Sequence, residues 1–342
     1  MSVLTRASQE LFSRSADERF ETLIDLVRHC HDQKQQSADR WLLPGAVQPE
    51  ATADGLQLRL GSEGFFQPND WAFSQLCKLG GVAKETVNRL SPDTAARVLG
   101  ETLPGGQRPM QVLAHEQRVR SIHGASYTRL HNAELLQVVQ EFAVDFQPPQ
   151  KGFNGATGLY CGEQDLFAFL IDPTGWVEID EGGAFAPGFF VWNSEVGRRS
   201  VGIQTFWFQA VCANHIVWDA VEVVDFSRKH TTNVREALGE VRGIIENLMA
   251  KRDARRDGFV SVIRKAAQER LGDDAEEVLK VLAQHGVSRS LAKQATEIAQ
   301  EQGRFTIFSL VDALTRLTRD VKWIGDRTEV DAKVASLLAL AL

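Results

Sequence analysis

The chain of 342 residues is 43% hydrophobic and 24% charged, and its 45 acidic against 38 basic side chains leave a formal net charge of −7. This composition is typical of a folded globular protein and excludes global disorder. No stretch approaches the roughly 20 consecutive apolar residues of a membrane helix, and residues 1–20 contain no apolar signal core, so we expect a cytoplasmic protein with no membrane partner.

The first of three predicted regions, residues 1–110, combines helices with strands. Apolar residues at helical spacing predict a helix over residues 15–36, and the alternation of apolar and polar residues over 56–60 predicts a strand. Three further helices are expected: one that follows the Pro68-Asn69-Asp70 turn and ends at Gly80, a shorter one at 84–90, and one that Ser91 caps and that runs to about Leu103.

The second region, residues 111–230, is predicted to be an α+β core. Strands are expected at 111–114, 119–122, 166–171 and 189–192, and a helix at about 132–144. The segment 201–212 mixes a period of two with a continuous apolar patch. Two interpretations of it stay open, a central strand or a strand that passes into a helix.

The third region, residues 231–342, has a helical pattern throughout. Asn233 with Glu236 predicts the cap of its first helix, and Gly286 and Gly303 stand where C-terminal caps belong. Further helices are expected at about 259–271, 274–285, 288–302, 306–320 and 328–341. The predicted fold is therefore α+β, with a mixed sheet in the central region, a helical N-terminal segment and an all-helical C-terminal tail.

The four cysteines, Cys30, Cys77, Cys161 and Cys212, are widely scattered and form no C-x-x-C pair. Closely spaced pairs would be expected of a small disulfide scaffold or of a structural zinc site. We therefore expect reduced thiols, most of them buried, because free cysteine is among the most frequently buried residue types.

Three stretches of the sequence carry a family resemblance. They are Trp71 to Leu90; Arg120-Ser121-Ile122 through Tyr127 to Leu136; and Val191-Trp192-Asn193-Ser194-Glu195-Val196-Gly197 through Ser200 to Val211-Cys212-Ala213-Asn214. The Asn-Ser-Glu-Val-Gly block of the third stretch is the most specific of them. On these residues the chain resembles the phage- and plasmid-borne family catalogued as domain of unknown function 932.

The resemblance implies a context more than a mechanism. Members of this family recur in phages, plasmids and integrated elements, and the family carries no assigned activity. The chain departs from the family pattern at two places. His215 stands where glycine is usual, and residues 122–126 separate Ser121 from Tyr127 in the middle stretch.

Arg118, Arg120, Tyr127, Arg129 and His131 form the most basic and aromatic stretch of the central region. On a regular strand, Arg118 and Arg120 would point to the same face. Guanidinium groups beside an aromatic ring suit single-stranded nucleic acid, because stacking and phosphate pairing tolerate any sequence. The alternative is a solvated strand face with no ligand.

Charge constrains this hypothesis. The central region carries 8 basic against 14 acidic side chains, and the strongest basic surplus in any of the three regions is 18 against 17, in residues 231–342. Proteins that bind duplex DNA through many phosphate contacts usually carry a larger surplus of basic over acidic side chains. A nucleic-acid site must therefore be a local groove, with basic and acidic side chains on different faces.

A second candidate site follows the apolar strand that ends near Trp192. Asn193, Ser194 and Glu195 precede Arg198 and Arg199, and such a cluster could bind a phosphate or a base edge. The alternative is a turn in which the asparagine and serine hydrogen-bond their own backbone while Glu195 pairs with an arginine.

Other chemistry has weaker support in the sequence. Cys212 and His215 have a Cys-x-x-His spacing but lack the second ligand pair of a structural zinc site. Asp172, Glu178, Asp180 and Glu181 could hold Mg²⁺ for a nuclease, although their position in a Pro- and Gly-containing loop favours a solvated hairpin edge. The sequence has no G-x-x-x-x-G-K-[ST] loop. We therefore expect no metal and no cofactor.

Two basic features lie in the C-terminal region. Residues 279–293 have the rhythm of a helix-turn-helix, with Ser288, Arg289, Ser290 and Lys293 at the start of the second helix. Helical tails also produce this pattern without binding DNA. The densest basic run, residues 251–256, is interpreted as a solvated helix end.

These observations leave three functional hypotheses. The first is an accessory protein of a mobile element that binds single-stranded DNA in recombination or replication, through Arg118, Arg120, Tyr127, Arg129, Asn193, Arg198 and Arg199. Its apolar end, Leu337 to Leu342, could serve a homo-oligomer. The second is a module that binds a host or element-encoded protein, for which Trp176, Trp192 and Trp218 are candidate contacts. The third is a metal-dependent enzyme acting on nucleic acid.

Overall fold

The computed structural model describes residues 10–149, 158–180, 183–210, 215–218, 225–301, 305–318 and 321–342. The described helices are α1 (Leu23–Gln35), α2 (Asp70–Leu79), α3 (Lys84–Val87), α4 (Pro92–Thr102), α5 (Asn132–Phe142), α6 (Glu236–Ala250), α7 (Arg252–Gln268), α8 (Ala275–Gln284), α9 (Arg289–Glu301), α10 (Ile307–Thr318) and α11 (Ile324–Ala335), with short 3₁₀ turns η2 (Pro44–Ala46) and η3 (Leu338–Ala341). The described strands are β1 (Glu18–Phe20), β2 (Ser37–Leu42), β3 (Val47–Thr52), β4 (Gly55–Leu60), β5 (Phe65–Pro68), β6 (Met110–His115), β7 (Arg118–Gly124), β8 (Leu159–Cys161), β9 (Leu166–Ile171), β10 (Val177–Ile179), β11 (Gly183–Asn193), β12 (Val201–Ala210), β13 (His215–Trp218) and β14 (Asp225–Arg228).

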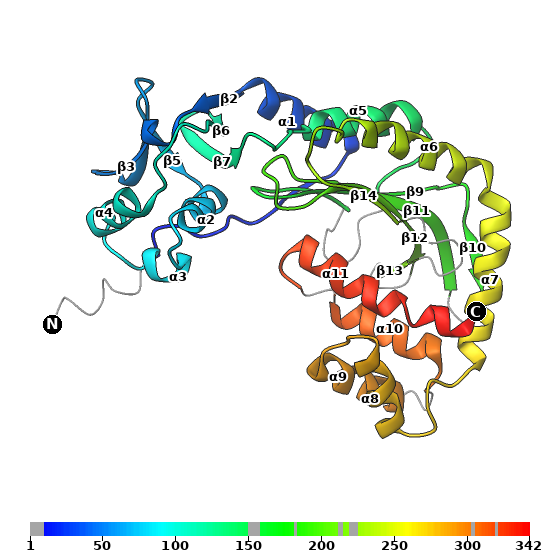
Figure 1. Cartoon of the computed structure of the whole chain (residues 1–342). Coiled ribbons are helices and arrows are strands. Elements are labelled where there is room, and N and C mark those ends of the chain that lie inside the picture. Colours follow the sequence, from blue (N-terminus) through cyan, green and yellow to red (C-terminus); the bar gives the residue numbers. More distant parts are fainter. Residues whose placement is uncertain are drawn as a thin grey trace.

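The strands form two sheets. The six-stranded sheet has the order β2-β6-β7-β5-β4-β3, and the eight-stranded sheet has the order β1-β8-β9-β11-β12-β13, with β10 beside β11 and β14 beside β12. Figure 1 shows the six-stranded sheet with α2–α4 at one end of an arched molecule and the eight-stranded sheet in its middle. The C-terminal helices continue the arch at its other end, so that the molecule has a concave side.

The six-stranded sheet packs with α2 and α4 around a separate hydrophobic core. Leu56, Leu58 and Leu60 alternate along β4 with partly exposed neighbours, and all three are buried. Phe73 and Leu76 of α2 and Leu99 of α4 complete this core. The predicted strand at 56–60, the hairpin of β6 and β7 and the caps of α2 and α4 by Asn69 and Ser91 are confirmed.

The eight-stranded sheet is covered on both faces. Along β9, Leu166, Ala168 and Leu170 pack with α1, α5 and α6, while Phe167 and Phe169 pack in an aromatic layer on the other face. This double burial explains why the segment reads as a continuous apolar run. The open question at residues 201–212 is answered for its described part, because residues 201–210 form the long strand β12 between β11 and β13.

The C-terminal helices pack on the end of this sheet. Phe185 and Trp207 share a core cluster with Phe259 of α7, and the rings of Trp207 and Phe259 stack with centroids 4.1 Å apart. Leu337 and Leu338 are buried in the same cluster, while Leu340 and Leu342 stay exposed. The apolar end that the sequence offered for assembly is therefore used in part by the protein's own core.

Four predicted helix starts are wrong. The helix expected at about 259–271 is α7, which begins at Arg252, and the one expected at about 328–341 is α11, which begins at Ile324 and ends at Ala335. The helix expected from residue 15 begins at Leu23, where Thr22 accepts a hydrogen bond from the Asp25 N–H, and residues 18–20 instead pair with β8. The first C-terminal helix begins at Glu236 without the expected side-chain cap from Asn233. For residues 18–20, pairing with the distant strand β8, which a local pattern does not contain, takes the place of the predicted helix.

The predicted α+β fold with C-terminal helices is confirmed. The six-stranded sheet is mixed because β5 pairs in parallel with β7, whereas the described pairs of the eight-stranded sheet are antiparallel. The division at residues 110 and 230 stays a prediction, and the six-stranded sheet takes strands from both sides of residue 110. Among the described residues, no helix has the length and apolar character needed to cross a membrane.

Candidate functional site

The segment of residues 193–197, which begins at the last residue of β11, joins the two sheets. Asn193, Ser194 and Glu195 are almost completely buried, although all three are polar. Burial of polar groups requires internal partners. The partners come from β7, from the chain leading into α5 and from α2, so this short segment connects three separate parts of the sequence.

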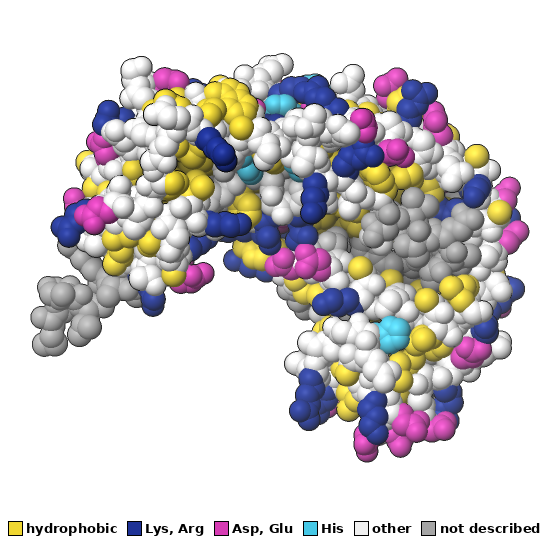
Figure 2. All heavy atoms as spheres, in the orientation of Figure 1, with side chains coloured by type: hydrophobic (Ala, Val, Ile, Leu, Met, Phe, Trp, Pro, Cys, Tyr) yellow, Lys and Arg dark blue, Asp and Glu magenta, His cyan; other side chains and the backbone are white. Residues whose placement is uncertain are grey.

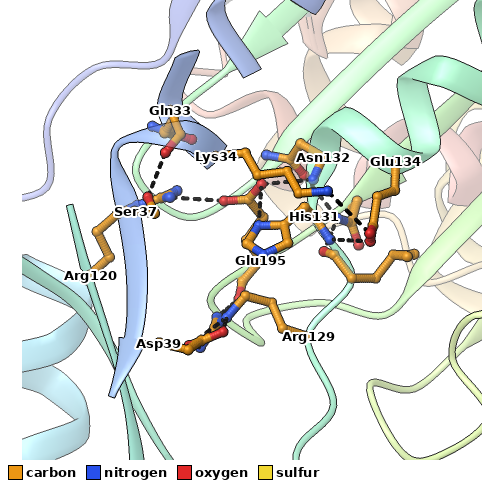
Figure 3. Close-up of polar contacts among 12 residues, drawn as sticks. Gln33, Lys34, Ser37, Asp39, Arg120, Arg129, His131, Asn132, Glu134 and Glu195 are labelled. Carbon is orange, nitrogen blue, oxygen red and sulfur yellow. Dashed lines mark hydrogen bonds and ion pairs between the residues drawn. The ribbon is translucent and has the colours of Figure 1, made fainter. Parts of the chain in front are cut away.

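Glu195 is the most heavily bonded of these residues. Its Oε2 accepts a hydrogen bond of 2.8 Å from Arg120 Nη1, and its Oε1 accepts one of 2.7 Å from the backbone N–H of Asn132. His131 Nδ1 lies 3.5 Å from the same Oε1, and Figure 3 shows these groups converging on the carboxylate. Burial opposes ionisation of Glu195, but the Arg120 charge together with His131 and Asn132 lowers its pKa to about 2.

Arg129 makes a second ion pair beside the first. Its Nη2 lies 2.8 Å from Asp39 Oδ1 on β2, and its Nε is 3.0 Å from both carboxylate oxygens. Its Nη1 donates to the backbone carbonyl of Glu195 and to Ser121 Oγ. The guanidinium group is therefore engaged on all sides within the protein.

The expectation that Arg118 and Arg120 share one face of a strand is wrong. Leu113 pairs with Ser121 and Ala114 pairs with Val119, so a β-bulge leaves Arg120 without an opposite residue. The bulge turns Arg120 inward, where the whole residue is 6% exposed, while Arg118 remains at the surface. Strand β7 therefore has neither the fully solvated face nor the two accessible arginines that the sequence suggested.

Tyr127 is stacked and hydrogen-bonded inside the protein. Its ring lies 3.7 Å from the ring of His123 and 5.4 Å from that of His230, centroid to centroid. Its hydroxyl donates to the Glu195 carbonyl at 2.8 Å. His123 therefore occupies a face of the ring on which a base would have to stack.

Asn193 and Ser194 serve the same junction. Asn193 Nδ2 donates at 2.9 Å to the Leu130 carbonyl and to Asn132 Oδ1. Ser194 Oγ donates to the Gln164 carbonyl and accepts from the Arg198 N–H. Of the seven nucleic-acid residues proposed from sequence, Arg120, Tyr127, Arg129 and Asn193 thus converge in one internal network, whereas Arg118, Arg198 and Arg199 do not belong to its centre.

Arg198 and Arg199 lie on a separate, open groove. The groove has a volume of about 430 Å³ and runs between the aromatic face of the eight-stranded sheet and α11; its lining includes Phe167, Phe190, Trp192, Arg198, Arg199 and Glu329. We call it the basic–aromatic groove. Figure 2 shows Lys and Arg side chains gathered along the concave side of the arch, with acidic side chains beside some of them.

The two arginines of the groove differ in freedom. Arg198 is exposed, and its Cζ lies 5.8 Å from the centroid of the Trp71 ring. Arg199 is mostly buried and pairs with Glu329 at 2.7 Å and with the buried Asp165 at 3.4 Å. Arg198 can therefore turn toward a ligand without loss of packing, whereas Arg199 is held by carboxylates.

The metal hypotheses find no support in the described part of the chain, where no three His, Cys, Asp or Glu residues are grouped to hold an ion. Asp172 is buried and pairs with Arg252, and Glu178 lies on the exposed hairpin of β10 and β11. Glu181, Cys212 and the His215 side chain lie outside the described residues. Cys30, Cys77 and Cys161 are buried and not bridged.

The two basic features of the C-terminal region differ in how far their side chains are buried. Within the run 251–256, Arg255 is buried and Arg252 contacts the buried Asp172, so this run is not simply a solvated helix end. The helices α8 and α9 do form a pair joined by a short turn at Gly286, and the residues proposed to open a recognition helix, Ser288 to Ser290, are exposed.

A comparison with known families identifies the chain. The family described as Domain of unknown function (DUF932) matches residues 119–323. The chain belongs to this family. The match includes β7, α5, the 193–197 segment and the C-terminal helices as far as the start of α11. Searches of curated proteins and of solved structures found no match.

The three stretches of resemblance to the DUF932 family meet at residues 193–197. The Trp71 indole donates to the Val196 carbonyl at 2.8 Å, and His123 Nε2 lies 2.9 Å from the same oxygen. Trp71 lies before the family match. Reasoning from sequence missed the roles of Trp71 and Asp39. It named His131 in the basic and aromatic stretch, but not its contact with Glu195.

Proposed function

We propose that the chain binds single-stranded nucleic acid in the basic–aromatic groove. The observation that carries the proposal is the exposed Arg198 beside Trp192 and Phe190 in one open groove. Single strands are held by cations that follow the phosphates and by aromatic rings on which bases stack. In the context of the DUF932 family, the role would be that of an accessory protein of a mobile element in recombination or replication, acting by binding.

The acidic balance of the central region is compatible with this function. Three of its carboxylates, Asp165, Asp172 and Glu195, are buried and lie close to arginines. Their charge is compensated inside the protein and does not face the groove directly. The surface field around Arg198 is therefore less negative than the composition of the region suggests.

The test is fluorescence-anisotropy binding of a labelled single-stranded oligonucleotide over a series of salt concentrations, with Arg198→Glu as the variant. Because Arg198 is exposed, the substitution should leave the fold intact and weaken binding about tenfold or more. The logarithm of affinity should fall linearly with the logarithm of salt, and less steeply in the variant.

The matched control is Arg97→Glu on α4, an exposed arginine whose side chain pairs only with Glu101 among the described contacts. It makes the same charge change away from the groove. Equal affinity of the Arg198 and Arg97 variants, or no binding by the native chain at low salt, would remove the proposal. Arg199 is a poorer test, since its loss also removes one of the two arginines that pair with the buried Asp165.

A second candidate function is binding of a protein partner. It is favoured by exposed apolar side chains on the six-stranded sheet, Trp41, Leu43 and Phe65, rather than by Trp192, which lies half-buried in the groove. Retention of a defined protein by the native chain, lost in a Phe65→Ser variant and kept in Arg198→Glu, would support this function over nucleic-acid binding.

A further inference from the structure

A second pocket lies directly over the Glu195 network and is distinct from the basic–aromatic groove. Its volume is about 360 Å³, and its lining includes Asp39, Trp41, Gln111, Arg129, His131 and Arg235. We call it the Trp41 pocket. Its size falls within the range of small-molecule sites. It takes residues from the edge of the six-stranded sheet, from the chain leading into α5 and from the start of α6.

The sheet side of the pocket places three different groups on one face. Trp41 on β2 pairs with Gln111 on β6, so their side chains are neighbours, and Asp39 stands two residues before Trp41 on the same face. Trp41 is 53% exposed. An exposed indole at the edge of a pocket is a stacking surface for a planar ring.

Gln111 supplies a polar group that lacks a partner. The residue is 8% exposed, and its Oε1 is buried with no hydrogen-bond donor among the described residues. A buried carbonyl oxygen that lacks a donor destabilises the folded protein. Because Gln111 lines the pocket, a rotation of its side chain would bring this buried oxygen to a donor on a ligand.

Asp39 offers a second acceptor. Its Oδ2 accepts one hydrogen bond, from Arg129 Nε at 3.0 Å, while Oδ1 accepts two. A carboxylate has about four acceptor positions, so Oδ2 can accept one more N–H. These groups favour a ligand with a planar ring that stacks on Trp41 and with N–H donors on the edge of that ring.

The opposite wall supplies positive charge. The Arg235 side chain is 67% exposed at the start of α6, and its nearest carboxylate, that of Glu134, lies 3.7 Å away. Arginine in this position suits a phosphate at the mouth of the pocket. A planar ring with amino donors at one end and a phosphate at the other is the chemistry of a nucleotide.

We propose that the Trp41 pocket binds one nucleoside monophosphate unit whose base carries an exocyclic amino group, with the base against Trp41 and the phosphate near Arg235. The amino group donates to Gln111 Oε1 or Asp39 Oδ2. This site is independent of the basic–aromatic groove, so a negative result at one site does not contradict the proposal for the other.

The test is isothermal titration of the native chain with CMP and with UMP, which differ at the position where cytosine has an amino donor and uracil an acceptor. CMP should bind at least about tenfold more tightly, because uracil places an acceptor against acceptors. Inorganic phosphate alone should bind at least tenfold more weakly than CMP. Absence of CMP binding, or equal affinity for CMP and UMP, would overturn the proposal.

Three variants locate the site. Trp41→Ala should weaken CMP binding about tenfold or more, and Arg235→Ala about threefold to tenfold. Gln111→Leu should reduce the preference for CMP over UMP while keeping or raising the melting temperature, because it removes an unsatisfied buried oxygen. Unchanged affinity in both Trp41→Ala and Arg235→Ala would place CMP elsewhere and overturn the proposal.

The source of the nucleotide is decided by competition. If CMP displaces a labelled single-stranded oligonucleotide from the native chain, the pocket holds a unit of the bound strand; if both bind together, it holds a free nucleotide. Arg198→Glu should leave CMP binding unchanged, since Arg198 does not line the Trp41 pocket. That result would distinguish loss of oligonucleotide binding at the basic–aromatic groove from loss of CMP binding at the Trp41 pocket.

Discussion

Arg120 Nη1 and Glu195 Oε2 lie 2.8 Å apart in an almost fully buried ion pair, with Arg120 in the six-stranded sheet and Glu195 just beyond the end of a strand of the eight-stranded sheet. Arg120 comes from the bulge in β7, and Glu195 follows β11. The pair therefore joins the six-stranded sheet to the eight-stranded sheet. It also places the most specific block of the DUF932 family at a structural junction.

Removal of one partner of this pair should destabilise the protein strongly. Arg120→Ala leaves the Glu195 carboxylate buried with its main counter-charge missing, which typically costs about 3–5 kcal/mol. The free energy of unfolding from urea denaturation measures the loss. Arg118→Ala, on the same strand but exposed, should change it by no more than about 0.5 kcal/mol. Similar losses in both variants would show that the pair does not join the sheets energetically.

Gly197 is required where the segment turns beneath the stacked rings. Its φ is +73°, and a Cβ there would lie 2.6 Å from His123 Cε1 and 2.9 Å from Tyr127 Cε2. Gly197→Ala should therefore destabilise the protein by on the order of 2 kcal/mol, from backbone strain and displacement of His123. Differential scanning calorimetry checks this as a fall in melting temperature.

The control for that prediction is Gly239→Ala inside α6. No atom lies within 4 Å of a Cβ at this glycine, and the position is helical. Alanine there should raise stability by about 0.5–1 kcal/mol. Destabilisation of equal size at both positions would contradict the steric argument for Gly197.

The two histidines around Tyr127 should make the protein sensitive to mild acid. Burial, assisted by the nearby Arg129 charge, lowers the pKa of His123 to about 4, and burial likewise lowers that of His230 to about 4. Their unfolded pKa is about 6.5. Between these values the unfolded chain binds protons that the folded chain does not, so their contribution is fully present above pH 6.5 and is lost as the pH falls toward 4.

Each histidine should contribute on the order of 2 kcal/mol to this loss. In a His123→Gln/His230→Gln variant, the free energy of unfolding should change less between pH 6.5 and pH 4 than in the native chain. The comparison between variants is needed because burial raises the pKa of Asp331 to about 6 and makes its contribution change in the opposite direction. Identical pH profiles for the two proteins would contradict the prediction.

Glu329 should limit binding in the basic–aromatic groove. Its carboxylate lies 2.7 Å from Arg199 Nη1 and lines the same groove, so it competes with a phosphate for that arginine. Glu329→Gln should raise affinity for a single-stranded oligonucleotide about threefold to tenfold at low salt. Glu297→Gln on α9, also exposed, makes the same charge change elsewhere and should leave the affinity unchanged. A fall in affinity with Glu329→Gln would place the strand elsewhere.

Much of the local structure could be predicted from the sequence, because its causes are local. The alternation at Leu56, Leu58 and Leu60 reports a strand with one buried face, and Asn69 and Ser91 act on helix N–H groups three residues ahead. The composition and the helical spacing of the tail likewise determined an α+β fold that ends in helices.

The site was decided by tertiary structure. Arg120 and Arg118 follow the same pattern in the sequence, and only the bulge opposite β6 turns one of them inward. The charge of Glu195 is stable because Arg120 of β7, Asn132 of α5 and His131 just before α5 surround its carboxylate, and nothing in its neighbouring residues predicts those partners. Sequence patterns report which groups prefer water, whereas the partner of a buried charge depends on which distant segments the fold brings within hydrogen-bonding distance.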